Sequence, residues 1–131
     1  MALNLRAVEV FKPYANELPE ALLESEGLAE QAVERWFSSE TLRIAKIGAE
    51  VLGAYAMDRI DEINFELHGV IVERRVRKQG LGRWLVGHAI GVAESKGGRH
   101  LHTGSTSGTR MYKSLGFVDS GDQHTFDMIQ E

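Results

Sequence analysis

The spacing of apolar residues switches several times along the chain between two periods, and each switch predicts a new element. Alternation of apolar and polar residues is typical of half-buried strands, whereas a period of three to four residues is typical of amphipathic helices. Pro13 follows the first predicted strand, and Gly97 follows the longest predicted helix. The predicted elements are strands at 3–11, 41–47, 51–57, 64–72, 100–103 and 125–129 and helices at 19–26, 29–38, 80–96 and 107–115. The chain is therefore predicted to be a mixed α and β protein.

The start of the helix predicted at 80–96 carries the most specific signal in the chain. An apolar run at 67–72 leads into basic residues, and Gly80 and Gly82 open the helix. Because no Ser, Thr, Asp or Asn stands in the capping position, the first backbone N–H groups lack a side-chain acceptor. These N–H groups, the helix dipole and the nearby cations favour an anion. The segment predicts a site for a phosphorylated ligand, with an exposed charged turn and a nucleic-acid patch as the alternatives. The basic residues are Arg74, Arg75, Arg77, Lys78 and Arg83.

Two common nucleotide-binding motifs do not fit this segment. The chain has no P-loop, and Leu85 stands where the dinucleotide fingerprint begun by Gly80 and Gly82 needs its third glycine. The segment instead resembles R/Q-x-x-G-x-G/A, the acyl-CoA pyrophosphate loop of the GNAT family of N-acetyltransferases. Residues 111–117, MYKSLGF, resemble the L-Y-x-x-x-G-F motif of the same family. The resemblance covers residues 41–131 well and the first 40 residues only in their pattern.

The resemblance implies a fold as well as a ligand. The expected α/β (α+β) acetyltransferase fold has a central mixed, mostly antiparallel twisted sheet of about six to seven strands, flanked by about four helices. At 131 residues the chain has the length of one domain, and we expect a single acetyltransferase domain over 1–131.

The resemblance also implies which residues hold acetyl-CoA. Backbone amides from Arg77 to Gly82 are expected to wrap the pyrophosphate, and the strand ending at Val72 is expected to bind the pantetheine arm through its backbone. Ser105 stands where many members of the family carry Asn, and a hydroxyl can replace an amide as a hydrogen-bonding group. The expected cofactor-binding residues are Val70, Val72, Arg77, Lys78, Gln79, Gly80, Leu81, Gly82, Arg83 and Ser105.

Three residues are candidates for acid–base chemistry. By resemblance, Tyr112 is expected to donate a proton to the departing CoA thiolate, with a packed core tyrosine as the alternative. A primary ammonium must lose a proton before its nitrogen attacks. Glu66 and His68 share strand parity with Val70 and Val72 and are expected on the same side of the sheet. Either is a candidate base, and either is equally a hydrogen-bonded sheet residue.

Composition and charge limit the classes of binding partner that we expect. The net charge is −4 although five of the 15 basic residues lie within 74–83, and residues 14–40 hold seven glutamates against Arg35 alone. This balance argues against nucleic-acid binding and weakly favours a cationic acceptor, with an ordinary solvated helix face as the favoured alternative for the glutamates. His100 and His102 have the spacing of a metal pair, but no further ligands follow at a recognisable interval. We expect no metal and no membrane segment, a cytoplasmic location because cysteines and a signal peptide are absent, and a possible homodimer through exposed sheet edges.

The sequence thus favours an acetyl-CoA-dependent N-acetyltransferase. The expected reaction is direct acetyl transfer in a ternary complex to a primary amine of a small molecule or peptide. The alternative is a non-catalytic CoA-binding regulatory or protein-interaction module with the same fold. That alternative predicts cofactor binding and tolerance of Tyr112→Phe.

Overall fold

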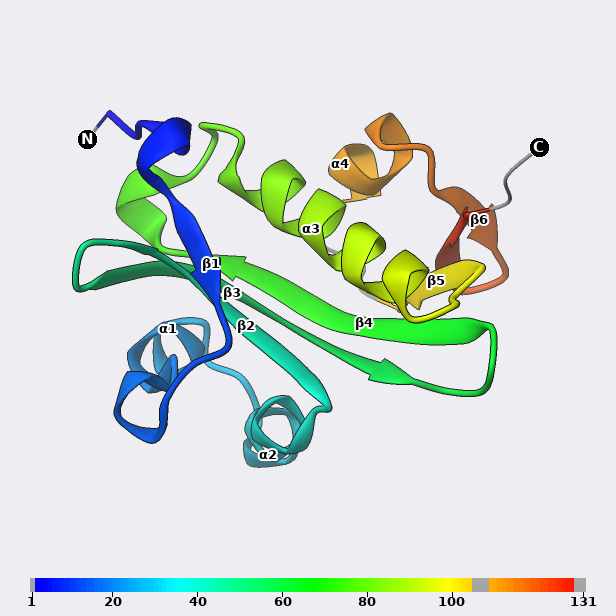
Figure 1. Ribbon diagram of the computed structural model, residues 1–131, viewed down its shortest axis with the longest axis horizontal. Helices are drawn as coiled ribbons and strands as arrows, with labels where there is room; N and C mark the ends of the chain where they lie inside the picture. Colours follow the sequence, from blue (N-terminus) through cyan, green and yellow to red (C-terminus); the bar gives the residue numbers. More distant parts are fainter. Residues whose placement is uncertain (1, 105–108, 129–131) are drawn as a thin grey trace.

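A computed structural model describes residues 2–104 and 109–128, which form a seven-stranded sheet with helices on both faces (Figure 1). The strand order is β1-β2-β3-β4-β5-β7-β6, and all neighbours are antiparallel except β4 and β5. The strands are β1 Glu9–Phe11, β2 Thr41–Ile47, β3 Glu50–Arg59, β4 Asn64–Val72, β5 His100–Thr103, β6 Val118–Ser120 and β7 Gln123–Asp127. The α-helices are α1 Glu20–Ser25, α2 Glu30–Ser38, α3 Leu81–Ser95 and α4 Thr109–Ser114. The predicted fold class is confirmed.

Two apolar layers hold the helices against the sheet. On one face, α3 buries Leu81, Leu85 and Ala89 at the four-residue spacing seen in the sequence. On the other face, Trp36 of α2 packs in a cluster with Ile71 of β4. Figure 1 shows α3 and α4 on one side of the strands and α1 and α2 on the other. None of the helices in the described ranges is long and apolar enough to cross a membrane.

The predicted boundaries hold best in the middle of the chain and least at its ends. The bounds of β4 and β5 match the predictions, but the strand predicted from Leu3 is only β1, Glu9–Phe11. A 3₁₀ turn at Leu5–Ala7 replaces its first half, because the Asn4 side chain accepts a hydrogen bond from the Arg6 N–H and caps that turn. Near the C-terminus the predicted strand at 125–129 begins earlier, at Gln123, and Ile129 lies outside the described residues.

A β-bulge in β4 decides which side chains face which layer. Leu67 pairs with Met57 and Gly69 pairs with Ala56, so His68 is the extra residue. Past the bulge, Val70 and Val72 pack on the α3 side. Glu66 and His68 point to the other face, where His68 bonds Asp58. The prediction that Glu66 and His68 share a side with Val70 and Val72 is therefore wrong, because the bulge breaks the alternation on which it depended.

The two parallel strands are paired over only part of their length. Asn64 of β4 pairs with His100 of β5 at one end of the paired stretch, and Glu66 pairs with His102 at the other end, just before the bulge. Further along β4, the Glu73 N–H bonds to the Leu52 carbonyl of β3, whereas the Val72 carbonyl accepts from Arg77 instead. Because backbone groups alternate along a strand, those of Val70 and Val72 point away from β3. Within residues 2–104 and 109–128, they line an opening in the sheet on the β5 side of β4.

Candidate cofactor site

The loop between β4 and α3 has an unusual backbone that brings its N–H groups to one place. A 3₁₀ turn at Arg74–Val76 follows β4, and Lys78 then adopts a φ of 63°, which is uncommon for a residue with a Cβ. Gly80, at φ 94°, is the residue before the first turn of α3, and no side chain caps that turn. The first N–H groups of α3 and the positive end of its dipole are thus directed out of the helix start, as the sequence predicted.

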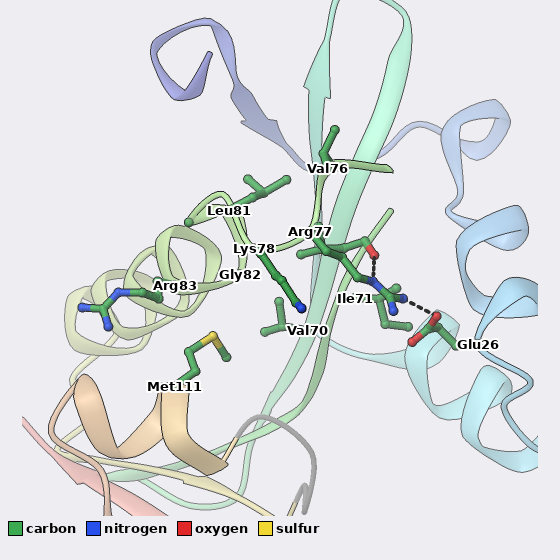
Figure 2. A pocket seen from close by; sticks show the side chains of 12 residues that line it. Glu26, Val70, Ile71, Val76, Arg77, Lys78, Leu81, Gly82, Arg83 and Met111 are labelled. Atoms are coloured by element: carbon green, nitrogen blue, oxygen red, sulfur yellow. Dashed lines mark hydrogen bonds and ion pairs between the residues drawn. The ribbon is translucent and has the colours of Figure 1, made fainter. Parts of the chain in front are cut away.

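A pocket of about 540 Å³ lies at this helix start. Val70, Ile71 and Val72 of β4 line it together with the loop and the first turn of α3. Met111 of α4 lies at one end of the pocket, beside the start of α3 (Figure 2). Glu26, just after α1, reaches it from the opposite side. The pocket therefore joins the helix start to the open edge of β4.

The cations around the pocket are held in different ways. Arg77 donates from Nε to the Val72 carbonyl at 2.9 Å and from Nη2 to a Glu26 carboxylate oxygen at 2.5 Å. Arg83 donates to the Ser114 hydroxyl of α4. The Lys78 side chain extends toward the middle of the pocket in Figure 2. The wall thus presents guanidinium and ammonium groups of which one, Arg77, is already paired with an anion.

Gly82 lets the helix start come close to its neighbours. A Cβ at this position would lie 3.3 Å from the Met111 sulfur and 3.8 Å from Val72 Cγ2. The bare backbone of the first turn is therefore exposed to the pocket between β4 and α4. Such close approach of backbone N–H groups is what diphosphate recognition requires. Together with the open edge of β4, these residues fit a ligand that carries a diphosphate and a linear amide arm.

Most predicted cofactor residues meet in this pocket. Those that line it are Val70, Val72, Arg77, Lys78, Gly80, Leu81, Gly82 and Arg83. Gln79 is not among the lining residues, because its side-chain oxygen accepts the Leu3 N–H at 2.6 Å and secures the N-terminal segment. Ser105 lies outside the described residues. Sequence reasoning missed Glu26 and Met111, and no local signal singles out Glu26 among its neighbouring glutamates.

Tyr112 of α4 lies on the same face of the sheet as α3 but inside the apolar core. Its side chain is buried between Phe117, edge-on at 5.1 Å between ring centroids, and His124, stacked at 6.1 Å. The phenol hydrogen-bonds with Thr103, the last residue of β5. Burial raises the pKa of the Tyr112 phenol above its usual value, and the Thr103 bond opposes this in part. Tyr112 does not line the pocket.

Glu66 and His68 lie on the sheet face that carries α1 and α2. His68 is nearly buried, with 8% of its side chain exposed, and its Nε2 lies 2.7 Å from an Asp58 carboxylate oxygen. Its Nδ1 lies 3.8 Å from Glu66 Oε1. The two candidate bases are therefore brought together, but across the sheet from Tyr112.

The paired histidines of β5 are engaged in sheet hydrogen bonds. His100 Nδ1 lies 2.7 Å from an Asp127 carboxylate oxygen. Both ring nitrogens of His102 have partners, Thr125 and Asn64, at 2.9 and 2.8 Å. Over residues 2–104 and 109–128, no group of three or more His, Cys, Asp or Glu side chains is arranged to hold a metal ion.

Comparison with known proteins agrees with this geometry. A family model described as the acetyltransferase (GNAT) family matches residues 7–117. No curated protein sequence matches the chain. A solved GNAT family acetyltransferase from Elizabethkingia anophelis with acetyl-CoA bound is 18% identical, with a TM-score of 0.78 over 92% of this chain and 98% of the other.

Two further solved structures share the fold. Aminoglycoside 6′-acetyltransferase type Ii is 20% identical, with a TM-score of 0.76 over 95% of this chain and 98% of the other. N-acetylglutamate synthase from Neisseria gonorrhoeae, complexed with coenzyme A and N-acetyl-glutamate, is 19% identical, with a TM-score of 0.76. That match covers 94% of this chain but 35% of the synthase. At these identities the similarity is one of fold.

Proposed function

Because the chain belongs to the GNAT family of acetyltransferases, we propose that it transfers an acetyl group from acetyl-CoA directly to a primary amine of a small molecule or peptide. The observation that carries this proposal is the pocket in which the uncapped start of α3 meets the β4 residues Val70 and Val72. Two structurally similar enzymes are named for acetylation of an aminoglycoside and for synthesis of N-acetylglutamate. These names support a nitrogen acceptor.

The pocket residues suit the two chemically distinct parts of acetyl-CoA. Backbone N–H groups from Lys78 to Gly82 and the Lys78 ammonium are suited to the diphosphate. The outward backbone groups of Val70 and Val72 are suited to the amides of the pantetheine arm, in the manner of an added strand. When bound, acetyl-CoA supplies the thioester that acylates the amine. Ser105 remains a proposed ligand of the same arm by family resemblance.

The residues that we assign as proton donor and proton acceptor lie on opposite faces of the sheet, near the point where β4 and β5 separate. We assign Tyr112 as the proton donor, since burial keeps its phenol protonated and its Thr103 partner follows the last β5 residue paired with β4. Glu66 and His68 approach the same level of the sheet from the other face, where they are suited to accept the amine proton. Donor and acceptor of protons are thereby kept apart.

A screen of amines tests this function directly. Purified protein is incubated with acetyl-CoA and a panel of primary amines, including diamines, amino acids and lysine-containing peptides, and released thiol is measured. Amine-dependent thiol release together with an acetylated product detected by mass is expected. Binding of acetyl-CoA without acetylation of any amine in the panel would contradict the proposal.

A non-catalytic CoA-binding module is the second candidate. It is favoured by the burial of Tyr112, whose phenol bonds Thr103 and does not line the pocket. Such a module binds CoA and acetyl-CoA equally well, releases no thiol and tolerates Tyr112→Phe. The amine screen therefore separates the two candidates, because both predict cofactor binding and only one predicts turnover.

A further inference from the structure

Three polar side chains form a cluster on the sheet face opposite the pocket. Asp58 of β3 and Glu66 of β4 are directly paired across the two strands, and the bulge places His68 beside both. Two carboxylates directly opposite each other on one face repel and cost stability. An imidazole N–H that donates a hydrogen bond to one of these carboxylates offsets part of that repulsion.

Asp58 is held by two bonds, one to each carboxylate oxygen. Oδ1 accepts the Glu40 backbone N–H at 2.8 Å, and Oδ2 lies 2.7 Å from His68 Nε2. Glu40 belongs to the connection between α2 and β2, so the carboxylate is fixed by a neighbouring segment as well as by β3. Only 8% of the His68 side chain is exposed, and its ring is held in this orientation.

This arrangement determines which nitrogen of His68 carries the proton. A carboxylate only accepts hydrogen bonds, so Nε2 bears the hydrogen and donates it to Asp58. Nδ1 then has a free lone pair directed to the side of Glu66, whose Oε1 at 3.8 Å is beyond hydrogen-bonding distance. Nδ1 and the Glu66 carboxylate are thus two neighbouring acceptors, and an ammonium placed beside both can donate a hydrogen bond to each.

The cluster lies at the level where the central strands separate. Glu66 and His102 are the last paired residues of β4 and β5, and His68 follows at the bulge. Thr103, the hydrogen-bonding partner of Tyr112, is the next residue of β5 after His102. His68 and Tyr112 therefore approach the same opening from opposite faces.

We propose that Asp58 is a positioning residue that fixes the His68 tautomer in which Nδ1 takes a proton from the acceptor ammonium. In this step one N–H bond of the ammonium breaks, its electron pair stays on the amine nitrogen, and the proton bonds to Nδ1. Asp58 then stabilises the imidazolium through the same hydrogen bond. The inference rests on the proposed acetyl transfer and assigns Asp58 a part in it.

Asp58→Asn tests this role without removing the Glu40 contact. The amide oxygen still accepts the Glu40 N–H, while the amide NH₂ donates to Nε2 and forces the hydrogen onto Nδ1. Thiol release from acetyl-CoA is measured with water alone and with butylamine as a minimal primary amine. We expect kcat to fall about a hundredfold with an unchanged KM for acetyl-CoA. Imidazole ¹⁵N NMR, assigned with His68→Gln, is expected to show the change of tautomer.

A matched pair elsewhere in the sheet provides the control. His100 Nδ1 lies 2.7 Å from Asp127, the same kind of contact at the same distance, and Asp127→Asn is expected to leave turnover unchanged. In the His68→Gln background, Asp58→Asn is expected to cause no additional loss. If Asp58→Asn does not fold, Asp58→Ser replaces it, because it also removes the anionic acceptor and the same losses are expected.

The outcomes separate this inference from the proposed function. Full turnover by Asp58→Asn, an unchanged His68 tautomer, or an equal loss in Asp127→Asn would overturn the role of Asp58 while acetyl transfer stands. Binding of acetyl-CoA by the unmodified protein with no turnover at all would overturn both.

Discussion

At the scale of a single residue, the two parts of the Tyr112 side chain have different surroundings. Its ring packs in the core, and its hydroxyl lies at the end of β5. Its ring contacts Phe117 and His124, and its hydroxyl bonds Thr103. The packing of the ring fits a core tyrosine, and the proton-donor role that family resemblance implies for the hydroxyl stays a prediction. A substitution that deletes only the hydroxyl separates the two.

Tyr112→Phe is expected to lower kcat by about a hundredfold and to leave acetyl-CoA affinity unchanged. Because burial raises the Tyr112 pKa above its usual value near 10, the phenol stays protonated across neutral and mildly alkaline pH. The ratio of wild-type to variant kcat should therefore be constant from about pH 7 to about pH 9. Loss of the buried Thr103 bond is expected to cost about 1 kcal/mol of unfolding free energy. A kcat equal to wild type would favour the non-catalytic module.

Glu26 competes with a bound anion for Arg77. The Arg77 guanidinium is already bonded to the Glu26 carboxylate at 2.5 Å inside the pocket that we assign to a diphosphate. Both side chains are partly exposed, at 28% and 39%, so the bond is weak and the carboxylate mainly repels an incoming phosphate.

Glu26→Gln is therefore expected to tighten CoA binding about two- to fivefold, which calorimetry measures. Glu24→Gln is the matched control, because it removes the same charge from the exposed side of α1. Weaker binding by Glu26→Gln would show instead that Glu26 orients Arg77 for the ligand. An equal gain in CoA affinity in both variants would show that the effect comes from the net charge of the protein and not from the position of Glu26.

At the scale of the element, glycine in the first turn of α3 lowers the stability of the helix but leaves its backbone N–H groups accessible. Gly82 is in the first turn, where a glycine is a weaker helix former than alanine by about 1 kcal/mol. A Cβ there would meet the Met111 sulfur at 3.3 Å, and this flexible side chain can move aside. The added methyl would still stand over the N–H groups that face the pocket.

Gly82→Ala is accordingly expected to change stability and affinity in opposite directions. The free energy of unfolding should rise by up to about 0.5 kcal/mol, and CoA affinity should fall at least about tenfold. Gly87→Ala, in the same helix with open space around its Cβ, should stabilise to a similar extent without changing affinity. Thermal unfolding and calorimetry on both variants check this. An unchanged CoA affinity in Gly82→Ala would exclude the backbone of α3 from the ligand site.

The same scale shows what the sequence predicts and what it does not. Apolar periodicity places β4, β5 and α3 closely, since each has an uninterrupted pattern with clear ends. The bulge at His68 has no such signal, because it depends on how β3 and β4 register against each other. That one inserted residue reverses the predicted side of Glu66 and His68. The local pattern of apolar residues also does not predict contacts between distant segments, such as that of Glu26 with Arg77.

At the scale of the whole molecule, the sheet separates two groups of candidate functional residues. Figure 1 shows α3 and α4 on one side of the sheet and α1 and α2 on the other. Tyr112 and the pocket wall formed by α3 belong to the first side, and Asp58, Glu66 and His68 belong to the second. The basic residues are also unevenly placed, since five of the 15 lie within 74–83 although the chain has a net charge of −4. This division suits a polyanionic donor on one face and a cationic acceptor on the other.

The central claim is that the loop from Arg77 to Gly82 binds the diphosphate of CoA. It is tested most directly by calorimetric titration of acetyl-CoA into the purified, cofactor-free protein, with 3′-dephospho-CoA as the comparison ligand. We predict one site with a dissociation constant in the micromolar range, about −8 kcal/mol at 1 µM, and retention of most of that affinity by the dephosphorylated analogue. Absence of binding at millimolar acetyl-CoA would contradict the assignment of the pocket and the acetyltransferase function built on it.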